Sequence, residues 1–200
     1  MKTRSLLALV VVVIGATSAP VASAETSPSV PSPPLGGPEI AIGVGYARAF
    51  AVESVAAPSA AGGVGVDLAV GLRRPMWTIG VDATHAELET DAGRRYLTTG
   101  AGLVVTFHLM PSVAYAPWIR TGIGYRYAKH GGVDAHGVQI GHVLAGIDLR
   151  MSPMIAMAPA AGVDLVVLPF RSGSTSGLDS LQASAFLGMI GRFDLSPIAE

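Results

Sequence analysis

Apolar residues alternate with small or polar residues along most of the chain beyond position 38. A period of two is typical of a β-strand, because successive side chains point to opposite faces of a sheet. Runs with this period are separated by stretches rich in Gly, Pro, Ser and charge, which favour turns and loops. The pattern therefore predicts eight strands, at residues 39–50, 62–72, 76–86, 95–109, 113–128, 137–151, 154–168 and 180–195.

The links between these strands alternate in length. Short links that carry a proline fall at 73–75, 110–112 and 152–153, and longer links fall at 51–61, 87–94, 129–136 and 169–179. Short turns at one rim and longer loops at the other are typical of a transmembrane β-barrel of the outer-membrane type. Each predicted strand is long enough for this role, since a tilted strand needs roughly 9–11 residues to cross the hydrocarbon core.

The two faces of each strand differ in size as well as in polarity. In the second strand, one face is formed by Val64, Val66, Leu68, Val70 and Leu72, and the other by Gly63, Gly65, Asp67, Ala69 and Gly71. A soluble barrel directs its large apolar side chains inward and its polar ones to water. Here the large face almost lacks Lys and Glu, and the charged face has little volume. We therefore predict the inverted arrangement, with bulk toward lipid and small or charged residues in a narrow lumen.

The fold predicted from these features is all-β: an eight-stranded antiparallel up-and-down transmembrane β-barrel. The aromatic residues agree with it, because Trp and Tyr favour the two membrane–water interfaces and most aromatics here fall near predicted strand ends. Those near the short links are Trp77, Phe107, Tyr115 and Phe193, and those near the long links are Phe50, Tyr96, Tyr125, Tyr127 and Phe170. Ordinary packing of aromatics within strands is the alternative explanation.

The N-terminal segment has the features of a secretory signal peptide. Lys2 and Arg4 precede the apolar run 6–15, and a small-residue cleavage site ends at Ala24. A retained anchor is the alternative, but a membrane-spanning helix needs about 20 apolar residues. The predicted division is a signal peptide at 1–24, a Pro/Ser/Gly-rich linker at 25–38, the outer-membrane barrel at 39–195 and a C-terminal tail at 196–200. The linker composition favours an extended tether.

Composition narrows the classes of function. Half of the 200 residues are hydrophobic and 14% are charged, against about 25% charged in an average soluble domain. Without the signal peptide the chain has 11 basic and 14 acidic residues, a net charge of −3, which gives no reason to expect nucleic acid as a partner. The chain has no cysteine, which excludes disulfides, thiol catalysis and cysteine-based metal sites. A closed barrel in lipid would supply the stability that disulfides often give to exported domains.

The order and faces of the strands between residues 39 and 195 resemble those of the small eight-stranded outer-membrane barrels, the OmpA/OmpX-like family. The resemblance implies a cell-envelope protein, porin-like in architecture, whose last strand is read by the barrel-insertion machinery. In that family the last strand usually ends on an aromatic residue with a glycine a few residues before it, and Gly188 and Phe193 fit this signal. Gly191 stands where a second large residue is expected. We expect no peptidoglycan-binding domain after the barrel.

The predicted inner face carries acidic residues and arginines in equal number: Asp67, Arg73, Asp82, Arg120, Arg126, Asp148, Arg150, Asp164, Arg192 and Asp194. Breaking a buried ion pair costs about 3–5 kcal/mol, so charges in a narrow lumen are expected to be paired. The balance predicts a network of ion pairs that plugs the lumen. Its predicted members are Asp67, Asp82, Arg120, Arg126, Asp148, Arg150, Asp164 and Arg192.

The turn at 73–75 predicts that Asp67 and Asp82 face each other across the second and third strands. Two carboxylates this close repel each other unless a cation lies between them. We therefore expect Arg120 or Arg126 to bridge the two aspartates. Replacing both aspartates by asparagine tests the bridge, because unchanged stability would refute it.

Other chemistry has less support in the sequence. His130 and His136 flank a glycine-containing loop, but their spacing matches no zinc signature, so no metal or cofactor site is predicted. The segment 171–177 is rich in hydroxyls without a neighbouring histidine, so we expect a flexible loop rather than a catalytic site. An open pore is not expected, because porins use about 16–18 strands.

The sequence thus predicts a monomeric, non-enzymatic outer-membrane barrel with a structural or surface-interaction role. Its expected partners are outer-membrane lipid, lipopolysaccharide and the barrel-insertion machinery. Both termini and the short turns are expected in the periplasm, and the long loops outside. The first alternative is a small-solute channel or transporter, which would conduct in planar bilayers. The others are an exported soluble barrel that binds a lipid-like ligand and an envelope enzyme that modifies lipid A.

Overall fold

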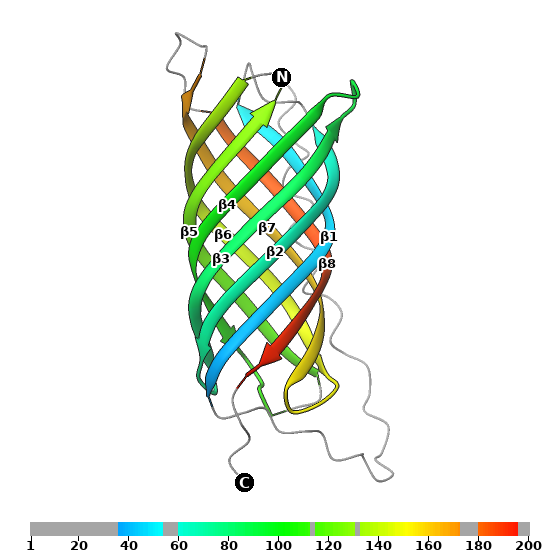
Figure 1. Cartoon of the computed structure of the whole chain (residues 1–200), viewed down its shortest axis with the longest axis vertical. Helices are drawn as coiled ribbons and strands as arrows, with labels where there is room; N and C mark the ends of the chain where they lie inside the picture. Colours follow the sequence, from blue (N-terminus) through cyan, green and yellow to red (C-terminus); the bar gives the residue numbers. More distant parts are fainter. Residues whose placement is uncertain (1–35, 54–59, 113–114, 131–132, 173–179, 196–200) are drawn as a thin grey trace, which may run out of the picture.

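Eight β-strands, each hydrogen-bonded to its neighbours in sequence, close into one antiparallel barrel in the computed structural model of the chain (Figure 1). The structure describes residues 36–53, 60–112, 115–130, 133–172 and 180–195. The strands are β1 (Gly37–Glu53), β2 (Ala61–Arg73), β3 (Trp77–Thr90), β4 (Arg95–His108), β5 (Tyr115–His130), β6 (Val133–Arg150), β7 (Ile155–Arg171) and β8 (Ser180–Asp194). The predicted eight-stranded, antiparallel, up-and-down barrel is confirmed.

Pairing between β1 and β8 closes the barrel, with Glu39 opposite Asp194. Following paired residues around the wall from Ala41 through all eight strands leads back to β1 at Ala51, ten residues further along. This stagger tilts the strands around the barrel axis. Glycine permits close approach at the seam, where a Cβ on Gly45 would lie 2.6 Å from the Cα of Gly188.

Different connections between strands lie at the two ends of the barrel (Figure 1). The β2–β3, β4–β5 and β6–β7 connections lie at the end where β1 begins and β8 ends, which we call the turn rim. The β1–β2, β3–β4, β5–β6 and β7–β8 connections lie at the opposite end, which we call the loop rim.

Two of the four links that the sequence predicts to be long are short. β3 continues to Thr90 and β4 begins at Arg95, so a tight turn replaces the predicted loop at 87–94. Gly93 makes this turn possible with a φ of 69°, and its N–H donates to the carbonyl of Thr90 at 2.8 Å. Residues 131–132 alone separate β5 from β6, in place of the predicted loop at 129–136. The error has a physical cause, because charged residues at these strand ends face outward from a regular ladder and resemble loop residues in the sequence.

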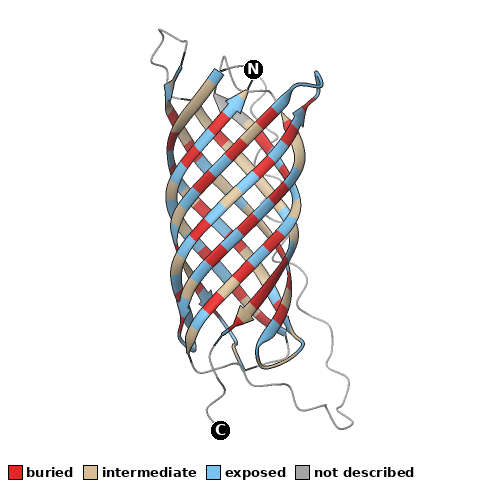
Figure 2. Ribbon diagram, in the orientation of Figure 1, coloured by how far each residue is buried: buried red, intermediate tan, exposed pale blue. Residues whose placement is uncertain are grey.

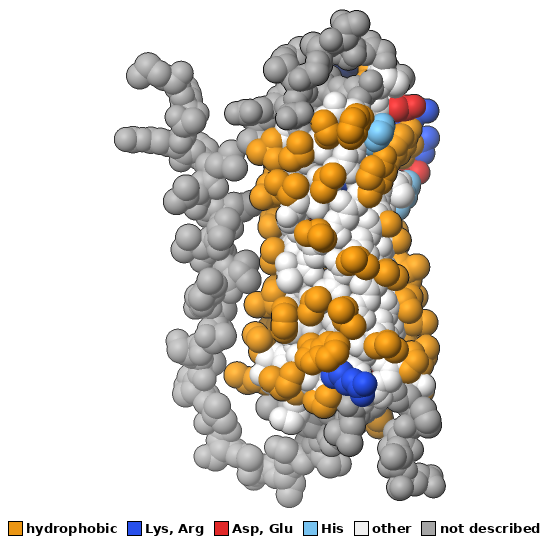
Figure 3. Space-filling view, turned by 90° about the vertical axis from the view of Figure 1, so that its left-hand side faces the viewer, with side chains coloured by type: hydrophobic (Ala, Val, Ile, Leu, Met, Phe, Trp, Pro, Cys, Tyr) orange, Lys and Arg blue, Asp and Glu red, His pale blue; other side chains and the backbone are white. Residues whose placement is uncertain are grey.

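Burial alternates along the strands with the period of two (Figure 2). Large apolar side chains point outward, and Leu72, Leu103 and Leu187 are 61%, 65% and 66% exposed. The residues that point inward are mostly small or charged. On the face seen in the space-filling view, apolar side chains are spread over most of the height of the wall, and the visible charged side chains lie mainly near its two ends (Figure 3). The wall therefore has the inside-out polarity that the sequence predicts.

The described barrel extends from Gly37 to Asp194, so the last two residues of the predicted linker belong to β1. The predicted signal peptide at 1–24, the rest of the linker up to residue 35 and the predicted tail at 196–200 lie outside the described residues. Among the residues that are described, no helix has the length and apolar character needed to cross a membrane.

Candidate functional site

The lumen gathers the buried charges of the described chain, which makes it the candidate functional site. Six acidic residues and five arginines point into it: Glu39, Asp67, Asp82, Asp148, Asp164, Asp194, Arg73, Arg120, Arg126, Arg150 and Arg192. These charges form groups that are separated along the strands by apolar residues. On β8, for example, Ile190 separates Arg192, near the turn rim, from Ser184, which contacts Asp164 nearer the loop rim.

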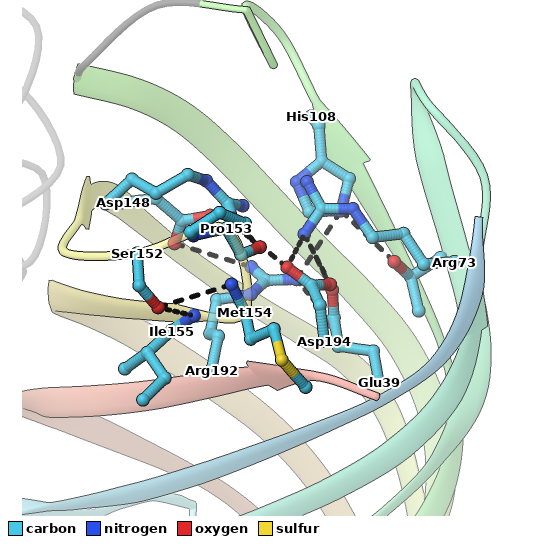
Figure 4. Close-up of polar contacts among 12 residues, drawn as sticks. Glu39, Arg73, His108, Asp148, Ser152, Pro153, Met154, Ile155, Arg192 and Asp194 are labelled. Atoms are coloured by element: carbon cyan, nitrogen blue, oxygen red, sulfur yellow. Dashed lines mark hydrogen bonds and ion pairs between the residues drawn. The ribbon is translucent and has the colours of Figure 1, made fainter. Parts of the chain in front are cut away.

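At the turn rim, two carboxylates and three arginines form one network, which we call the rim network (Figure 4). Nη1 of Arg73 donates to Oε2 of Glu39 at 3.1 Å and to Oδ1 of Asp194 at 3.0 Å. Nη1 of Arg150 donates to Oδ2 of Asp194 at 3.0 Å, and Nη2 of Arg192 donates to Oε1 of Glu39 at 2.5 Å. Because Glu39 and Asp194 pair across β1 and β8, the rim network ties together the seam that closes the barrel.

Trp118 lies in the lumen beside the rim network and contacts Arg192, a member of that network. The guanidinium of Arg192 lies 4.9 Å from the ring centroid of Trp118, and its Nη1 lies 3.8 Å from Oδ1 of Asp148. Trp118 points inward, opposite Gly146 on β6, where a Cβ would lie 2.6 Å from the ring. The missing side chain at Gly146 therefore makes room for the indole. A cation on an aromatic face is favourable, the more so when both are removed from water.

Farther from the turn rim, Arg120 and Asp67 form a buried pair, with Nη1 of Arg120 donating to Oδ1 of Asp67 at 2.8 Å. The predicted facing of Asp67 and Asp82 is wrong by two residues, because Asp67 pairs with Thr84 in the β2–β3 ladder. The ladder ends at Arg73 opposite Thr78, which displaces β3 from the predicted register. Arg120 thus reaches one aspartate of the predicted bridge, and no ion pair joins Asp82 to another described residue.

Nearer the loop rim, Asp164 accepts hydrogen bonds from four side chains, which together with it we call the Asp164 cluster. The donors are Nη2 of Arg126 at 3.0 Å, Nε2 of Gln139 at 2.8 Å, Nδ1 of His142 at 2.6 Å and Oγ of Ser184 at 3.3 Å. An ionised carboxylate can only accept hydrogen bonds. Nδ1 of His142 therefore carries a proton, and its Nε2 is left for another contact.

A β-bulge in β6 brings two of these donors together. Gln139 and His142 are three residues apart, so a regular strand would point them to opposite faces. The ladders of β6 with β5 and with β7 both shift register between these two residues, so β6 carries an extra residue at 140–141. Both side chains are consequently buried in the lumen. Re-aiming side chains in this way is a common role of β-bulges near functional sites.

Beyond the Asp164 cluster, the polarity of the wall reverses. Leu88, Tyr96 and Leu168 point inward among alanines and form an apolar core at the loop rim. The hydroxyl of Tyr96 donates to Oε1 of Gln182 at 2.7 Å. The outward positions of the same strands carry charge, as in the exposed pair formed by Arg95 and Glu87. This end of the wall therefore has the polarity of a soluble barrel.

The Asp164 cluster contains an acid, an imidazole and a hydroxyl, but not in the order that nucleophilic catalysis needs. In a catalytic triad the acid orients the base and the base contacts the nucleophile. Here Ser184 and His142 both contact Asp164, and these two described residues share no hydrogen bond. No group of three His, Asp or Glu side chains suited to a metal ion occurs in the described part of the chain.

The two histidines that flank the β5–β6 turn lie apart. The rings of His130 and Tyr96 have centroids 6.0 Å apart. His136 is hydrogen-bonded through Nδ1 to the hydroxyl of Tyr125 at 2.6 Å and stacks on Phe170 with centroids 5.1 Å apart. The hydroxyl-rich segment 171–177 lies mostly outside the described residues.

All eight residues of the predicted lumenal network point inward, each in a stretch of strand over which the period of two is unbroken. Sequence reasoning missed Glu39, because it is the first residue of the predicted strand, and it missed Gln139 and His142. The glycine at position 141 was the available signal, since a glycine inside a strand often marks a bulge.

Solved structures of similar fold include Neisserial surface protein A, at 13% identity and a TM-score of 0.64 over 80% of this chain and 99% of that chain. The outer membrane protein OprG from Pseudomonas aeruginosa aligns at 10% identity and a TM-score of 0.45, over 82% of this chain and 98% of that one. No known family model and no curated protein matches the sequence. The likeness to Neisserial surface protein A confirms the predicted fold, that of the small eight-stranded barrels.

Proposed function

We propose that the protein is a non-enzymatic outer-membrane barrel whose lumen is filled by side chains and whose role is structural or in surface interaction. The observation that carries this proposal is the reversal of wall polarity along the barrel axis. A soluble barrel buries its apolar residues along its whole length. This wall forms an inner core without charge at the loop rim. Elsewhere it directs most of its leucines, valines and isoleucines outward, and it lines the lumen with charged and small residues beside a few apolar side chains such as Trp118 and Ile190.

The height of the apolar band fits a membrane. On β3, outward residues are apolar from Trp77 to Ala83 and are followed by His85 and Glu87. A strand that rises about 3.4 Å per residue and is tilted by about 40° gains about 2.5 Å of height per residue. Ala83 therefore lies about 15 Å above Trp77, and Glu87, the first charged residue of this face, lies about 25 Å above it. The uncharged part of the face thus fits within the apolar band of about 25 Å in outer-membrane barrels.

Aromatic residues at both edges of the band support the same placement. Trp77, Phe107 and Tyr115 are exposed near the turn rim, and Tyr46 and Tyr125 are exposed toward the loop rim. Trp and Tyr concentrate at membrane interfaces because their rings combine an apolar body with a polar group. In our proposal the turn rim faces the periplasm and the loop rim extends beyond the outer leaflet.

The proposed partners follow from this orientation. The apolar band would contact lipid and the acyl chains of lipopolysaccharide, and the barrel-insertion machinery would deliver the chain after export through a cleaved signal peptide. A monomer suffices, because β1 pairs with β8 and the barrel has no free strand edge among the described residues. The filled lumen supports a role without transport, since the rim network and Trp118 occupy the turn rim.

Membrane extraction and gel mobility test the proposal. We expect the mature chain to require detergent for extraction and to migrate differently on gels before and after boiling, because a closed barrel resists unfolding by detergent. A chain that stays in solution without detergent would overturn the membrane assignment in favour of an exported soluble barrel.

Conductance and lipid analysis test the filled lumen and the non-enzymatic role. In planar bilayers we expect no steady conductance, and a regular conductance would favour the small-solute channel. Expression of the protein should leave the mass of lipid A unchanged, and a mass shift would identify an envelope enzyme.

A further inference from the structure

A cavity of about 60 Å³ lies inside the barrel between the Asp67–Arg120 pair and the Asp164 cluster. Polar residues from at least six strands line it, among them Asp67, Thr84, Arg126, His142, Asp164 and Ser184. Apolar residues such as Phe186 complete the lining. A cavity measured in this way needs about 10–15 Å³ for each water molecule that it holds. This cavity therefore has room for about four to six water molecules.

Three buried polar atoms of the lining residues have no hydrogen-bond partner among the described residues: Oδ2 of Asp67, Nε of Arg126 and Nε2 of His142. The three residues are 4%, 5% and 6% exposed. Buried polar groups in folded proteins are almost always satisfied, by protein or by ordered water. Three such atoms around one cavity therefore point to a ligand that accepts and donates hydrogen bonds.

The other contacts of these residues restrict what the ligand can be. Arg126 uses Nη1 on Thr84 and Nη2 on Asp164, so its Nε–H is left as a donor. Asp67 uses Oδ1 on Arg120, so its Oδ2 is left as an acceptor. An anion would fit the arginine but meet the Asp67 carboxylate, and a cation would fit Asp67 but meet the arginine. A neutral molecule that both donates and accepts satisfies both.

We propose that the cavity binds a cluster of ordered water molecules that hydrogen-bond to Oδ2 of Asp67, Nε of Arg126 and Nε2 of His142. The cluster joins the Asp67–Arg120 pair to the Asp164 cluster, so that the middle of the lumen forms one continuous hydrogen-bond network. Buried water commonly makes about three hydrogen bonds to otherwise unsatisfied groups. The inference does not depend on the membrane assignment, since it uses the contacts within the lumen alone.

A high-resolution crystal structure of the wild-type barrel, with a second data set collected under xenon pressure, tests the proposal. A cavity lined only by apolar side chains stays dry and binds xenon, whereas a polar cavity holds water. We expect ordered waters within hydrogen-bond distance of all three atoms and no xenon in the cavity. Xenon in the cavity, a bound ion in place of water, or a direct contact that closes the space without water would each overturn the proposal.

A pair of variants at Ala47, which also lines the cavity, gives an independent readout. Ala47→Val adds apolar volume, so it should displace ordered water and lower the urea midpoint of unfolding by leaving a polar atom unpaired. Ala47→Ser adds a hydroxyl in a similar volume, so it should retain the waters and keep a midpoint close to that of wild type. A higher midpoint for Ala47→Val would refute the proposal, because filling a dry cavity stabilises a protein.

Discussion

Replacing Leu103 by arginine should destabilise the barrel far more than the same replacement at Val64. Both side chains are exposed on the outer wall, at 65% and 60%. Leu103 lies between Val81 and Ile123 on the neighbouring strands, well inside the proposed lipid band. Val64 lies opposite Glu87 on β3, at the edge of that band nearest the loop rim. A soluble barrel would expose both positions to water.

The size of the expected difference follows from the depth of Leu103 in the band. Leu103 is four residues from Phe107 near the turn rim, which at about 2.5 Å of height per residue places it about 10 Å into the band. Arginine near the midplane costs about 2–4 kcal/mol, whereas near an interface it costs about 0–1 kcal/mol. A difference of about 2 kcal/mol is about 30-fold in the unfolding equilibrium.

Equilibrium unfolding in urea, with the barrel inserted in phospholipid vesicles, measures this difference. Tryptophan fluorescence can follow the transition, because Trp118 is buried in the lumen and Trp77 lies at the edge of the band. The shift in gel mobility on boiling should first show that both variants insert. If Leu103→Arg were as mild as Val64→Arg, Leu103 would face water and the membrane assignment would be wrong. If Val64→Arg were as severe as Leu103→Arg, the lipid band would extend beyond Val64 toward the loop rim.

Two further changes test the packing of the lumen in the same unfolding assay. Arg120→Met should cost about 3–5 kcal/mol, because it leaves the Asp67 charge buried without its partner, and adding Asp67→Asn should recover much of this loss. Strictly additive effects would contradict the pairing. Gly146→Ala should cost about 1–3 kcal/mol, because its Cβ would overpack the ring of Trp118. Gly141→Ala is the matched control, since its Cβ has no described neighbour nearer than 3.9 Å, and equal losses in the two variants would argue against the Trp118 contact.

The sequence predicts the faces of the strands well wherever the ladder is regular. From β2 to β5 the pairing has no bulge, so a residue at an even or odd position keeps its face along the whole strand. Asp67, Asp82, Arg120 and Arg126 could therefore be assigned to the lumen. The bulge in β6 breaks this rule. Odd-numbered residues such as Gln139 point inward before the bulge, and even-numbered residues such as His142 point inward after it.

Contacts across the lumen could be predicted only in part. The sequence leads us to expect Arg120 or Arg126 near Asp67 and Asp82, but it does not choose between these arginines. In the structure Asp67 on β2 meets Arg120 on β5, and these strands are not neighbours in the wall. The contact depends on the stagger that accumulates as the barrel closes, which no local pattern encodes. The inward position of Trp118 also depends on a distant residue, because Gly146 on the adjacent strand supplies the space.

The charged lumen also bears on how such a chain can be exported. The strands are 13–18 residues long, and a lumen filled by leucine and isoleucine would make them apolar on both faces. Runs of that kind approach the roughly 17–25 apolar residues of a membrane-spanning helix, so they would tend to be retained in the first membrane that the chain meets. Asp67, Asp82 and Arg120 interrupt such runs in β2, β3 and β5 in the unfolded chain. In the folded barrel, ion pairs such as Asp67–Arg120 then let these charges fill the lumen without the cost of an unpaired buried charge. The polarity of the lumen therefore suits both the route that we propose for the chain and the fold that it reaches.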